Sequence, residues 1–286
     1  MKVTIITATF NSEKSLALNL NSVGRQFYKN IEHIIIDNCS TDGTIELAKS
    51  YDHISLIISE KYDGVYEAIN KCISLATGDI IGILYPDSYL ANEHTVSNIV
   101  SEFKSTNAQA TYGNLIYVDN KHPEKIKRVW ISGGYDPKLF YSGWILPHPT
   151  FYVKKEVYEQ YGLYNDSFKY AADYEMILRL LLKHKIKIAP MREVIVYMLA
   201  GGEGNKDIGT RIKVNFEDRL AWQTVGLTPK WYTFHFKPVR KLWQYVLNFL
   251  SVKWLVHIPP SCENGSFIND DSNQLAKLID INSEKF

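Results

Sequence analysis

The sequence has few cysteines, and none of them lies in a metal-binding or disulfide pattern. Its 286 residues include three, Cys39, Cys72 and Cys262, with no C-x-x-C pair. An odd number of widely spaced cysteines argues against a zinc site or a disulfide framework and favours a reducing compartment. No stretch approaches the roughly 20 uninterrupted apolar residues that cross a bilayer. The N-terminal apolar run meets Asn11 too early for a signal peptide, so we expect a cytoplasmic protein.

Several sequence signals of common functions are also missing. The formal net charge is only +1, whereas a nucleic-acid-binding domain is usually strongly basic. No G-x-G-x-x-G follows the first apolar run, and no G-x-x-x-x-G-K-[ST] occurs. No G-x-S-x-G is present either. These absences argue against nucleic-acid binding, dinucleotide binding, a P-loop ATPase and an α/β-hydrolase.

The first 120 residues alternate short apolar runs with segments of helical period. The runs are residues 3–7, 31–37, 54–59 and 79–85. Strands that are apolar throughout, each followed by a helix, are typical of a parallel sheet covered on both faces. We therefore predict an α/β fold with a mostly parallel sheet flanked by helices.

Two helices in this half have clear apolar faces. Ser12 is expected to cap the first, with Leu16, Leu20, Val23 and Phe27 on its inner face. The other runs from Val65 to Ala76, and we expect Gly78 to close it.

The pattern changes after residue 110. Strand-like residues 110–119 and 126–132 lack a helix between them, and helices at 155–161 and 172–184 precede a strand pair at 186–198. We interpret this as a mixed-sheet extension of the same domain. One more helix, near 210–225, is closed by Gly226.

The last residues differ in composition from the body. Residues 230–258 are aromatic and basic, and residues after Pro260 are polar. The predicted organisation is a domain of residues 1–225, with halves 1–120 and 121–225, then a helical extension 226–260 and a polar tail 261–286. Aromatic and basic side chains together suit an anionic membrane surface, although ordinary packing on the body is the alternative.

Acidic and small polar side chains gather where the predicted parallel strands end. Asp37 ends the second strand and Asp87 follows the fourth. Ligands of open α/β sheets bind at this edge. A Mg²⁺ ion takes one or two carboxylates and fills its remaining positions with phosphate oxygens and water. The edge therefore suits a nucleotide diphosphate with a metal.

Four motifs in order resemble the family 2 glycosyltransferases, which are nucleotide-sugar enzymes of the GT-A fold. They are "TIITATFNSEKSLALNLNSV", "IIIDNCSTDGT", "YDGVYEAINKCISLATGDIIGILYPDS" and "HPTFYVKKEVYEQYGLYNDSFKYAADYEMILRLL". The similarity covers residues 2 to about 225 and is greatest to the capsule and colanic-acid type. It implies a GT-A-like sheet with a nucleotide-binding half and an acceptor half.

The resemblance also implies a reaction and its site residues. It implies inverting transfer of one sugar from a UDP- or GDP-sugar to a saccharide acceptor, with a polyprenyl-diphosphate-linked acceptor expected in bacterial surface polysaccharide synthesis. Asp173 falls on the general base and Asp87 on the ligand of Mg²⁺ or Mn²⁺. Tyr85 and His148 are expected on the donor and acceptor side. The residues expected to bind the nucleotide are Thr7, Thr9, Asn11, Asp37, Asp63 and Asn70.

The sequence departs from the family at one element. Tyr85-Pro86-Asp87-Ser88 stands where Asp-x-Asp-Asp is usual. This keeps open a catalytically weak or inactive relative that binds a nucleotide as an assembly partner. A nucleotidyltransferase is a weaker alternative. It needs a Gly-rich basic loop after the first strand, and "TATFNSEK" does not supply one.

Other polar residues have simpler interpretations. Asp42 in Ser40-Thr41-Asp42-Gly43 is typical of a turn and helix cap. Glu175 is expected to be a solvated charge pointing away from Asp173. Residues 199–211, with glycines beside Lys206 and Arg211, are interpreted as a loop that closes over the diphosphate, or else an exposed connector.

Overall fold

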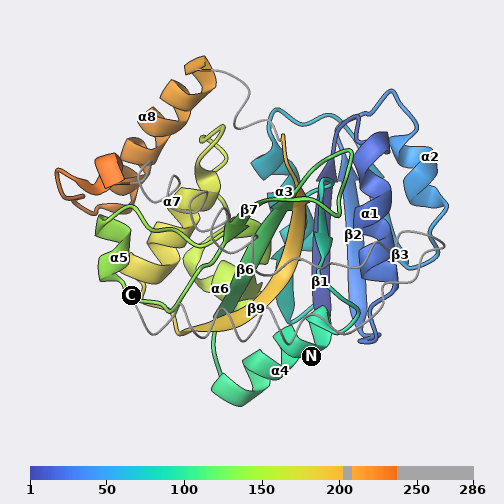
Figure 1. The fold of residues 1–286 in the computed structure, drawn as a ribbon, viewed down its shortest axis with the longest axis horizontal. Coiled ribbons are helices and arrows are strands. Elements are labelled where there is room, and N and C mark those ends of the chain that lie inside the picture. Colours follow the sequence, from blue (N-terminus) through green and yellow to red (C-terminus); the bar gives the residue numbers. More distant parts are fainter. Residues whose placement is uncertain (202–207, 237–286) are drawn as a thin grey trace.

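The structure is a computed structural model that describes residues 1–201 and 208–236. Within them the strands form one sheet, ordered β3-β2-β1-β4-β8-β6-β9-β5, with β7 paired to β6 (Figure 1). The strands are β1 Val3–Thr9, β2 Ile31–Asp37, β3 Ile54–Ser59, β4 Ile80–Ile83, β5 Ser88–Leu90, β6 Ala110–Val118, β7 Ile126–Trp130, β8 Tyr152–Lys154 and β9 Ile188–Leu199. The pairs β3–β2, β2–β1 and β1–β4 are parallel, whereas β8 is antiparallel to β4 and β6. The predicted parallel half and mixed half are therefore both present.

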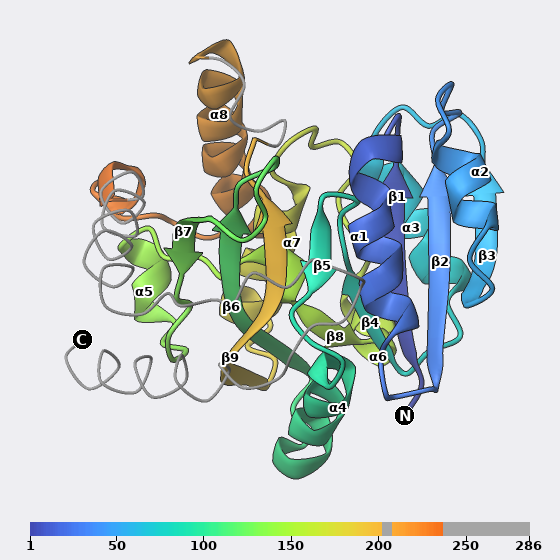
Figure 2. The same cartoon turned by 45° about the vertical axis from the view of Figure 1, so that its right-hand side comes forward.

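Helices cover both faces of the sheet. They are α1 Glu13–Gly24, α2 Thr44–Lys49, α3 Val65–Leu75, α4 Thr95–Thr106, α5 Lys138–Tyr141, α6 Lys155–Tyr161, α7 Ala172–Leu178 and α8 Ile208–Val225. Successive side chains of β2 point to opposite faces of the sheet, so their contacts show which helices cover each face. Ile35 packs with Leu16 of α1 and Ala48 of α2, whereas Ile34 and Ile36 belong to the cluster that contains α3. Figure 2 shows α1 in front of the parallel strands and α3 behind them.

Three local predictions in the first half are corrected. Phe27 lies beyond the end of α1 and is 57% exposed, so it is not on the inner face. Ser12 is at the N-cap position, but its hydroxyl donates to the carbonyl of Phe10 at 3.1 Å and does not cap the helix. The helix α3 ends at Leu75, and Gly78 lies beyond it, with its N–H donating to the Thr4 hydroxyl at 3.0 Å. A Cβ at Gly78 would lie 2.5 Å from that hydroxyl oxygen, so close strand packing, not helix closure, requires the glycine.

Two strands, one in each half of the domain, were not predicted by the sequence pattern. The three-residue strands β5 and β8 are too short to show a period. The predicted strand pair at 186–198 is wrong, because Ile188–Leu199 is one strand, parallel to β6 and antiparallel to β5. The predicted helix at 172–184 is α7 followed by a π-helical turn, Arg179–Lys183. Gly226, with φ +80°, closes α8 as expected.

Three predictions fall wholly or partly outside the described residues. The proposed closing loop at 199–211 includes residues 202–207, and the aromatic-basic extension is described only to Phe236. The predicted polar tail, residues 261–286, lies entirely outside the described residues. Within residues 1–201 and 208–236, no helix has both the length and the apolar character needed to cross a membrane.

Candidate active site

The turn that carries Asp87 joins β4 to β5 at the edge where the parallel strands end. The Ser88 N–H donates to the Tyr85 carbonyl at 2.9 Å, and the Asp87 carbonyl accepts from the Leu199 N–H at 2.8 Å. The Asp87 carboxylate is half-buried and accepts a bond from the Ser88 hydroxyl at 3.3 Å. Burial raises the pKa of this carboxyl to about 6, because a charged form is disfavoured away from water. Ser88 therefore supports the carboxylate that precedes it.

Asp173 is the second residue of α7, and its carboxylate lies near the Asp87 turn. One carboxylate oxygen accepts the Tyr174 N–H at 2.8 Å. The pKa of Tyr85 is raised well above its ordinary value, by burial first and then by the charges of Asp173 and Asp87. Both carboxylates thus act on one buried hydroxyl. Asp173 likewise raises the pKa of Tyr66, after burial.

Tyr85, His148 and Tyr164 form a buried chain of hydrogen bonds. The Tyr85 hydroxyl lies 3.0 Å from Nδ1 of His148, and the Tyr164 hydroxyl lies 2.7 Å from Nε2. Burial lowers the pKa of His148, although the charge of Asp173 opposes this, so the imidazole is neutral at pH 7. A neutral ring has one donor and one acceptor nitrogen, so one tyrosine hydroxyl donates to the ring and the other accepts from it. The structure therefore brings Tyr85, His148, Asp87 and Asp173 together.

Asp37 lies at the ends of β1, β2 and β3 with its side chain fully buried. Its carboxylate accepts bonds from Thr9 Oγ1 at 2.9 Å, Ser59 Oγ at 2.9 Å and the Ser40 N–H at 2.8 Å, and from the Ser40 hydroxyl. These bonds tie the three strand ends together. Contact of Asp37 with a nucleotide base stays a prediction.

Asn11 follows β1 and lies at the surface in the left-handed region, with φ 46°. Its side-chain oxygen accepts the Thr41 N–H at 2.9 Å, and its own N–H donates to Ser40 Oγ at 2.8 Å. Asp42 accepts the Thr44 N–H at 3.1 Å and the Thr44 hydroxyl, which is the turn chemistry expected of it.

The other three predicted nucleotide-binding residues lie in different surroundings. Thr7 is fully buried, and its hydroxyl lies 3.1 Å from Nε2 of His33, beneath α1. Asn70 is bonded to the backbone of Tyr164 in both directions, at 2.8 and 2.9 Å. Asp63 is exposed at the start of α3. Of the three, Asp63 is the most exposed, Asn70 is half-buried and Thr7 is fully buried.

Glu175 does not form the solvated charge that the sequence predicted. Its side chain is buried, and it accepts the Nε–H of Arg179 at 2.9 Å. The same guanidinium donates to the carbonyls of Tyr161, Gly162 and Leu163. Glu175 points away from Asp173 as expected, but toward the interior, because Arg179 provides a buried partner.

Two further residues, which no sequence motif indicated, hold the site. Asn19 of α1 is fully buried, and its amide donates to the carbonyls of Tyr85 and Ser88 at 2.9 and 3.1 Å. Tyr66 stacks on Tyr164, with ring centroids 5.6 Å apart, beside Asp173. A polar residue among the apolar positions of an otherwise amphipathic helix was the available signal for Asn19.

The donor groups at this edge suit a hard divalent cation. Asp87 offers a half-buried carboxylate with an oxygen not bonded to Ser88. Among the described residues, no three His, Cys, Asp or Glu side chains are grouped to hold a metal ion. A single carboxylate fits a Mg²⁺ or Mn²⁺ ion that takes most of its ligands from a diphosphate and water.

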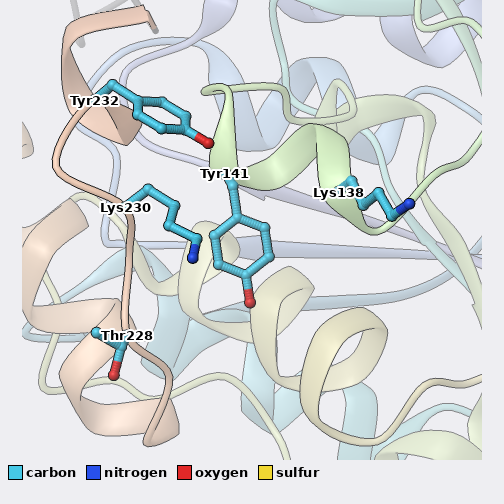
Figure 3. Close-up of a pocket in the computed structure, with 5 residues that line it drawn as sticks. All are labelled: Lys138, Tyr141, Thr228, Lys230 and Tyr232. Carbon is cyan, nitrogen blue, oxygen red and sulfur yellow. The ribbon is translucent and has the colours of Figure 1, made fainter.

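A pocket of about 450 Å³ lies between α5 and the segment after α8 (Figure 3). It is lined by Lys138, Tyr141, Thr228, Lys230 and Tyr232. None of the predicted site residues lines it. The candidate active site is therefore defined by the contacts around Asp87 and Asp173, and not by this pocket.

A family model described as "Glycosyl transferase family 2" matches residues 4–162, more than half of the chain. The chain belongs to this family. It is a glycosyltransferase, and the family predicted from the four motifs is confirmed.

Two curated relatives are similar in sequence. EpsE of Bacillus subtilis (strain 168), described as "Putative glycosyltransferase EpsE", is 41% identical over 85 residues, which cover 28% of this chain and 31% of that protein. A PGL/p-HBAD biosynthesis glycosyltransferase of Mycobacterium tuberculosis (strain ATCC 25177 / H37Ra) is 25% identical over 226 residues, covering 77% of this chain and 84% of that protein. The chain thus matches about a third of the length of EpsE and most of the mycobacterial protein.

Solved structures share the fold of this glycosyltransferase. S. aureus TarS 1–349 has a TM-score of 0.61 and 15% identity, covering 95% of this chain and 98% of that chain. The mannosyltransferase PcManGT from Pyrobaculum calidifontis, in complex with GDP-Man and Mn²⁺, has a TM-score of 0.59 and 16% identity, covering 99% and 80%. These likenesses confirm the predicted GT-A-like fold.

Proposed function

We propose that this glycosyltransferase moves one sugar from a UDP- or GDP-sugar to a saccharide acceptor with inversion at the anomeric carbon. The observation that carries the proposal is the position of Asp173 and Asp87, whose charges act on the same buried Tyr85 hydroxyl. Two carboxylates near one hydroxyl, one in the turn after β4 and one in α7, can serve the acceptor and the leaving group separately. TarS has also been crystallised with UDP and with UDP-GlcNAc, and PcManGT with GDP-Man and Mn²⁺, which supports a nucleotide-sugar donor and a divalent cation.

In this proposal Asp173 is the general base. An acceptor hydroxyl is a weak nucleophile, so a carboxylate within hydrogen-bond reach takes its proton as the oxygen attacks the anomeric carbon. The bond between that carbon and the diphosphate oxygen breaks from the opposite face. A Mg²⁺ or Mn²⁺ ion held by Asp87 would offset the charge of the leaving diphosphate. Removal of the base is expected to lower the rate about 10²- to 10⁴-fold.

The remaining predicted residues are proposed to surround the donor. Thr9, Asn11 and Asp37 lie at the ends of β1 and β2, where the nucleotide would bind. Asp63 is proposed to border the diphosphate directly. Thr7 and Asn70 are proposed to support this pocket from behind, through their contacts with His33 and with the backbone of Tyr164. Tyr85 is proposed to approach the donor sugar, with its ring held by His148.

We propose a polyprenyl-diphosphate-linked acceptor in the synthesis of a bacterial surface polysaccharide, as in the capsule and colanic-acid type. Such an acceptor would bring the enzyme to the cytoplasmic face of the membrane, with residues 230–258 as the contacting segment. Trp231, in the described part of this segment, is 84% exposed. The proposed boundaries are residues 1–225 for the transferase domain, 226–260 for the extension and 261–286 for the tail.

The test is sugar transfer or donor hydrolysis by purified protein with Mn²⁺ and a panel of UDP- and GDP-sugars. We expect turnover by the parent, and losses of about 10²-fold or more in Asp173→Asn and Asp87→Ala. Asp52→Asn is the matched control, because Asp52 is exposed just before β3, at the opposite edge of the sheet. If both site variants match the parent, the assigned roles are wrong.

The departure at Tyr85-Pro86-Asp87-Ser88 favours one competing proposal, a nucleotide-binding assembly partner without turnover. Fold and family do not guarantee activity. Nucleotide that binds only the folded state raises the melting temperature, so a thermal-shift panel detects binding separately from chemistry. Binding of UDP or GDP with no turnover of any donor would favour the assembly role.

A further inference from the structure

Glu217 of α8 is bonded to the chain immediately before the proposed base. Its Oε2 accepts the N–H groups of Tyr170 at 2.7 Å and Ala171 at 2.9 Å, and its Oε1 accepts the Lys169 N–H at 3.1 Å. Asp173 lies two residues beyond Ala171. One carboxylate thus fixes three consecutive peptide groups that lead into α7. Hydrogen bonds to a charged acceptor are roughly twice as strong as neutral ones.

A second hydrogen bond from α8 is made to Tyr174, the residue after Asp173. The buried Trp222 donates from Nε1 to the Tyr174 hydroxyl at 2.8 Å. Trp222 and Tyr174 also belong to the same buried cluster. The helix α8 therefore holds the chain on both sides of Asp173. Figure 1 shows α7 and α8 together at the end of the sheet away from α2 and β3.

We propose that Glu217 is a positioning residue for Asp173, with Trp222 as its partner on the other side. The inference rests on the proposed function, in which Asp173 takes a proton from the acceptor. A base must keep its hydrogen-bond distance to the reacting hydroxyl, and a displacement of about 1 Å costs on the order of 10²-fold in rate. The predicted nucleotide-binding residues Thr9, Asn11 and Asp37 lie in the other half of the fold, on β1 and β2 and the loop after β1. Loss of Glu217 should therefore lower kcat and leave nucleotide affinity unchanged.

The first experiment compares Glu217→Ala and Glu217→Gln with the parent in the full chain. We expect kcat to fall about 10- to 100-fold in Glu217→Ala, with the Kd for UDP or GDP within twofold of the parent. Glu217→Gln keeps one oxygen, which can still accept from Tyr170 and Ala171. Its kcat should therefore lie between those of the parent and of Glu217→Ala. Trp222→Phe removes the donor to Tyr174 and keeps an aromatic ring, and we expect about a 3- to 10-fold fall in kcat. Gln223→Ala is the matched control, because Gln223 is exposed on the same helix.

The second experiment measures hydrogen exchange of backbone amides and does not depend on turnover. In Glu217→Ala the amides of Lys169, Tyr170 and Ala171 should exchange at least tenfold faster, whereas those of β1 and β2 should not change. In Glu217→Gln we expect faster exchange at Lys169 alone. A folded Glu217→Ala variant with parental kcat would overturn the positioning role, even if its melting temperature falls.

The two experiments also separate this inference from the proposed function. If the parent turns over no nucleotide sugar, the proposed function fails. Unchanged amide exchange in Glu217→Ala overturns the inference in either case, because the contact would then not order the turn before α7. If Glu217→Ala does not fold, the kcat and the exchange pattern of Glu217→Gln decide.

Discussion

The side-chain nitrogen of Asn19 donates a hydrogen bond to the backbone carbonyl of Tyr85 at 2.9 Å, across 66 residues of sequence. The same nitrogen lies 3.1 Å from the carbonyl of Ser88, so it holds both ends of the turn that carries Asp87. The helix α1 thus fixes the geometry of the proposed cation-binding carboxylate, although Asn19 itself is fully buried.

Asn19→Leu should therefore weaken both the fold and the site. Leucine has a similar volume but no donor, so the Tyr85 carbonyl keeps only the Ser88 N–H and the Ser88 carbonyl loses the Asn19 amide, at about 1–3 kcal/mol of unfolding free energy. We expect the Mn²⁺ concentration for half-maximal activity to rise about tenfold. Asn98→Ala is the control, since it removes a hydrogen bond to Glu193 near the surface and should change stability by less than about 0.5 kcal/mol. Urea unfolding and Mn²⁺ titration of the activity check this, and an Asn19→Leu variant that matches the control would contradict it.

Asp87→Asn should stabilise the protein at neutral pH while it removes activity. Burial raises the pKa of Asp87 from 3.8 to about 6, so keeping it ionised above pH 6 opposes folding. Between pH 3.8 and about pH 6 the folded state holds the Asp87 proton more tightly than the unfolded chain does, so the free energy of unfolding falls as the pH rises. The neutral amide avoids this penalty, and we expect a gain of about 1–3 kcal/mol at pH 7.5 that vanishes near pH 4. Urea unfolding at both pH values measures it, and an equal gain at pH 4 would contradict the burial explanation.

The sequence predicted the parallel half of the fold because its signals are local. Apolar runs such as 31–37 and the helical stripe of α3 have enough residues to show a period. The strands β5 and β8 have three residues each, and their pairing with β9 and β4 comes from distant parts of the chain. The order of the mixed half was therefore not readable from periodicity.

The grouping of the candidate site residues was readable in part for the same reason, and their roles stay predictions. Asp87 and Asp173 each follow a local pattern, a strand end and a helix start, and the structure brings them beside Tyr85. Asn19 and Glu217 act on residues 66 to 69 and 46 to 48 positions away. Nothing in their immediate sequence shows those contacts. Glu175 was mistaken for a solvated charge because its partner Arg179 also looks like a surface residue on a helix.

The buried His33 should make the protein less stable as the pH falls below about 6.5. Its pKa is lowered from 6.5 to about 3, by burial first and then by the charge of His53. The unfolded chain takes up the proton first, so the free energy of unfolding falls between pH 6.5 and pH 3, by at most about 1.4 kcal/mol per pH unit. His33→Gln can still bond to Thr7. Its free energy of unfolding should depend less steeply on pH, because nearly one proton fewer is taken up on unfolding.

The measurement is urea unfolding of parent and His33→Gln between pH 7 and pH 5. Glu32 does not interfere in this window. Its pKa is lowered to about 2, because hydrogen bonds from Thr4 and Thr77 outweigh its burial, and its contribution is lost only below about pH 4.5. Burial also lowers the pKa of His148, which contributes to the slope of both proteins alike. If the free energy of unfolding falls equally with pH in parent and variant, His33 is not the source of the pH dependence.

Arg179→Lys should destabilise the acceptor half strongly, although it keeps the charge. The guanidinium of Arg179 binds Glu175 at 2.9 Å and the Leu163 carbonyl at 2.6 Å, and it also donates to Tyr161 and Gly162. A lysine ammonium cannot span these acceptors, so buried groups lose their partners. Breaking a buried pair costs about 3–5 kcal/mol, and we expect at least about 2 kcal/mol here. Glu156→Ala is the control, because its pair with Lys154 is exposed and should contribute less than about 1 kcal/mol. Urea unfolding midpoints, compared at an unchanged m-value, measure the loss of stability in Arg179→Lys and in Glu156→Ala. Equal losses in the two variants would show that Arg179 behaves as a surface charge.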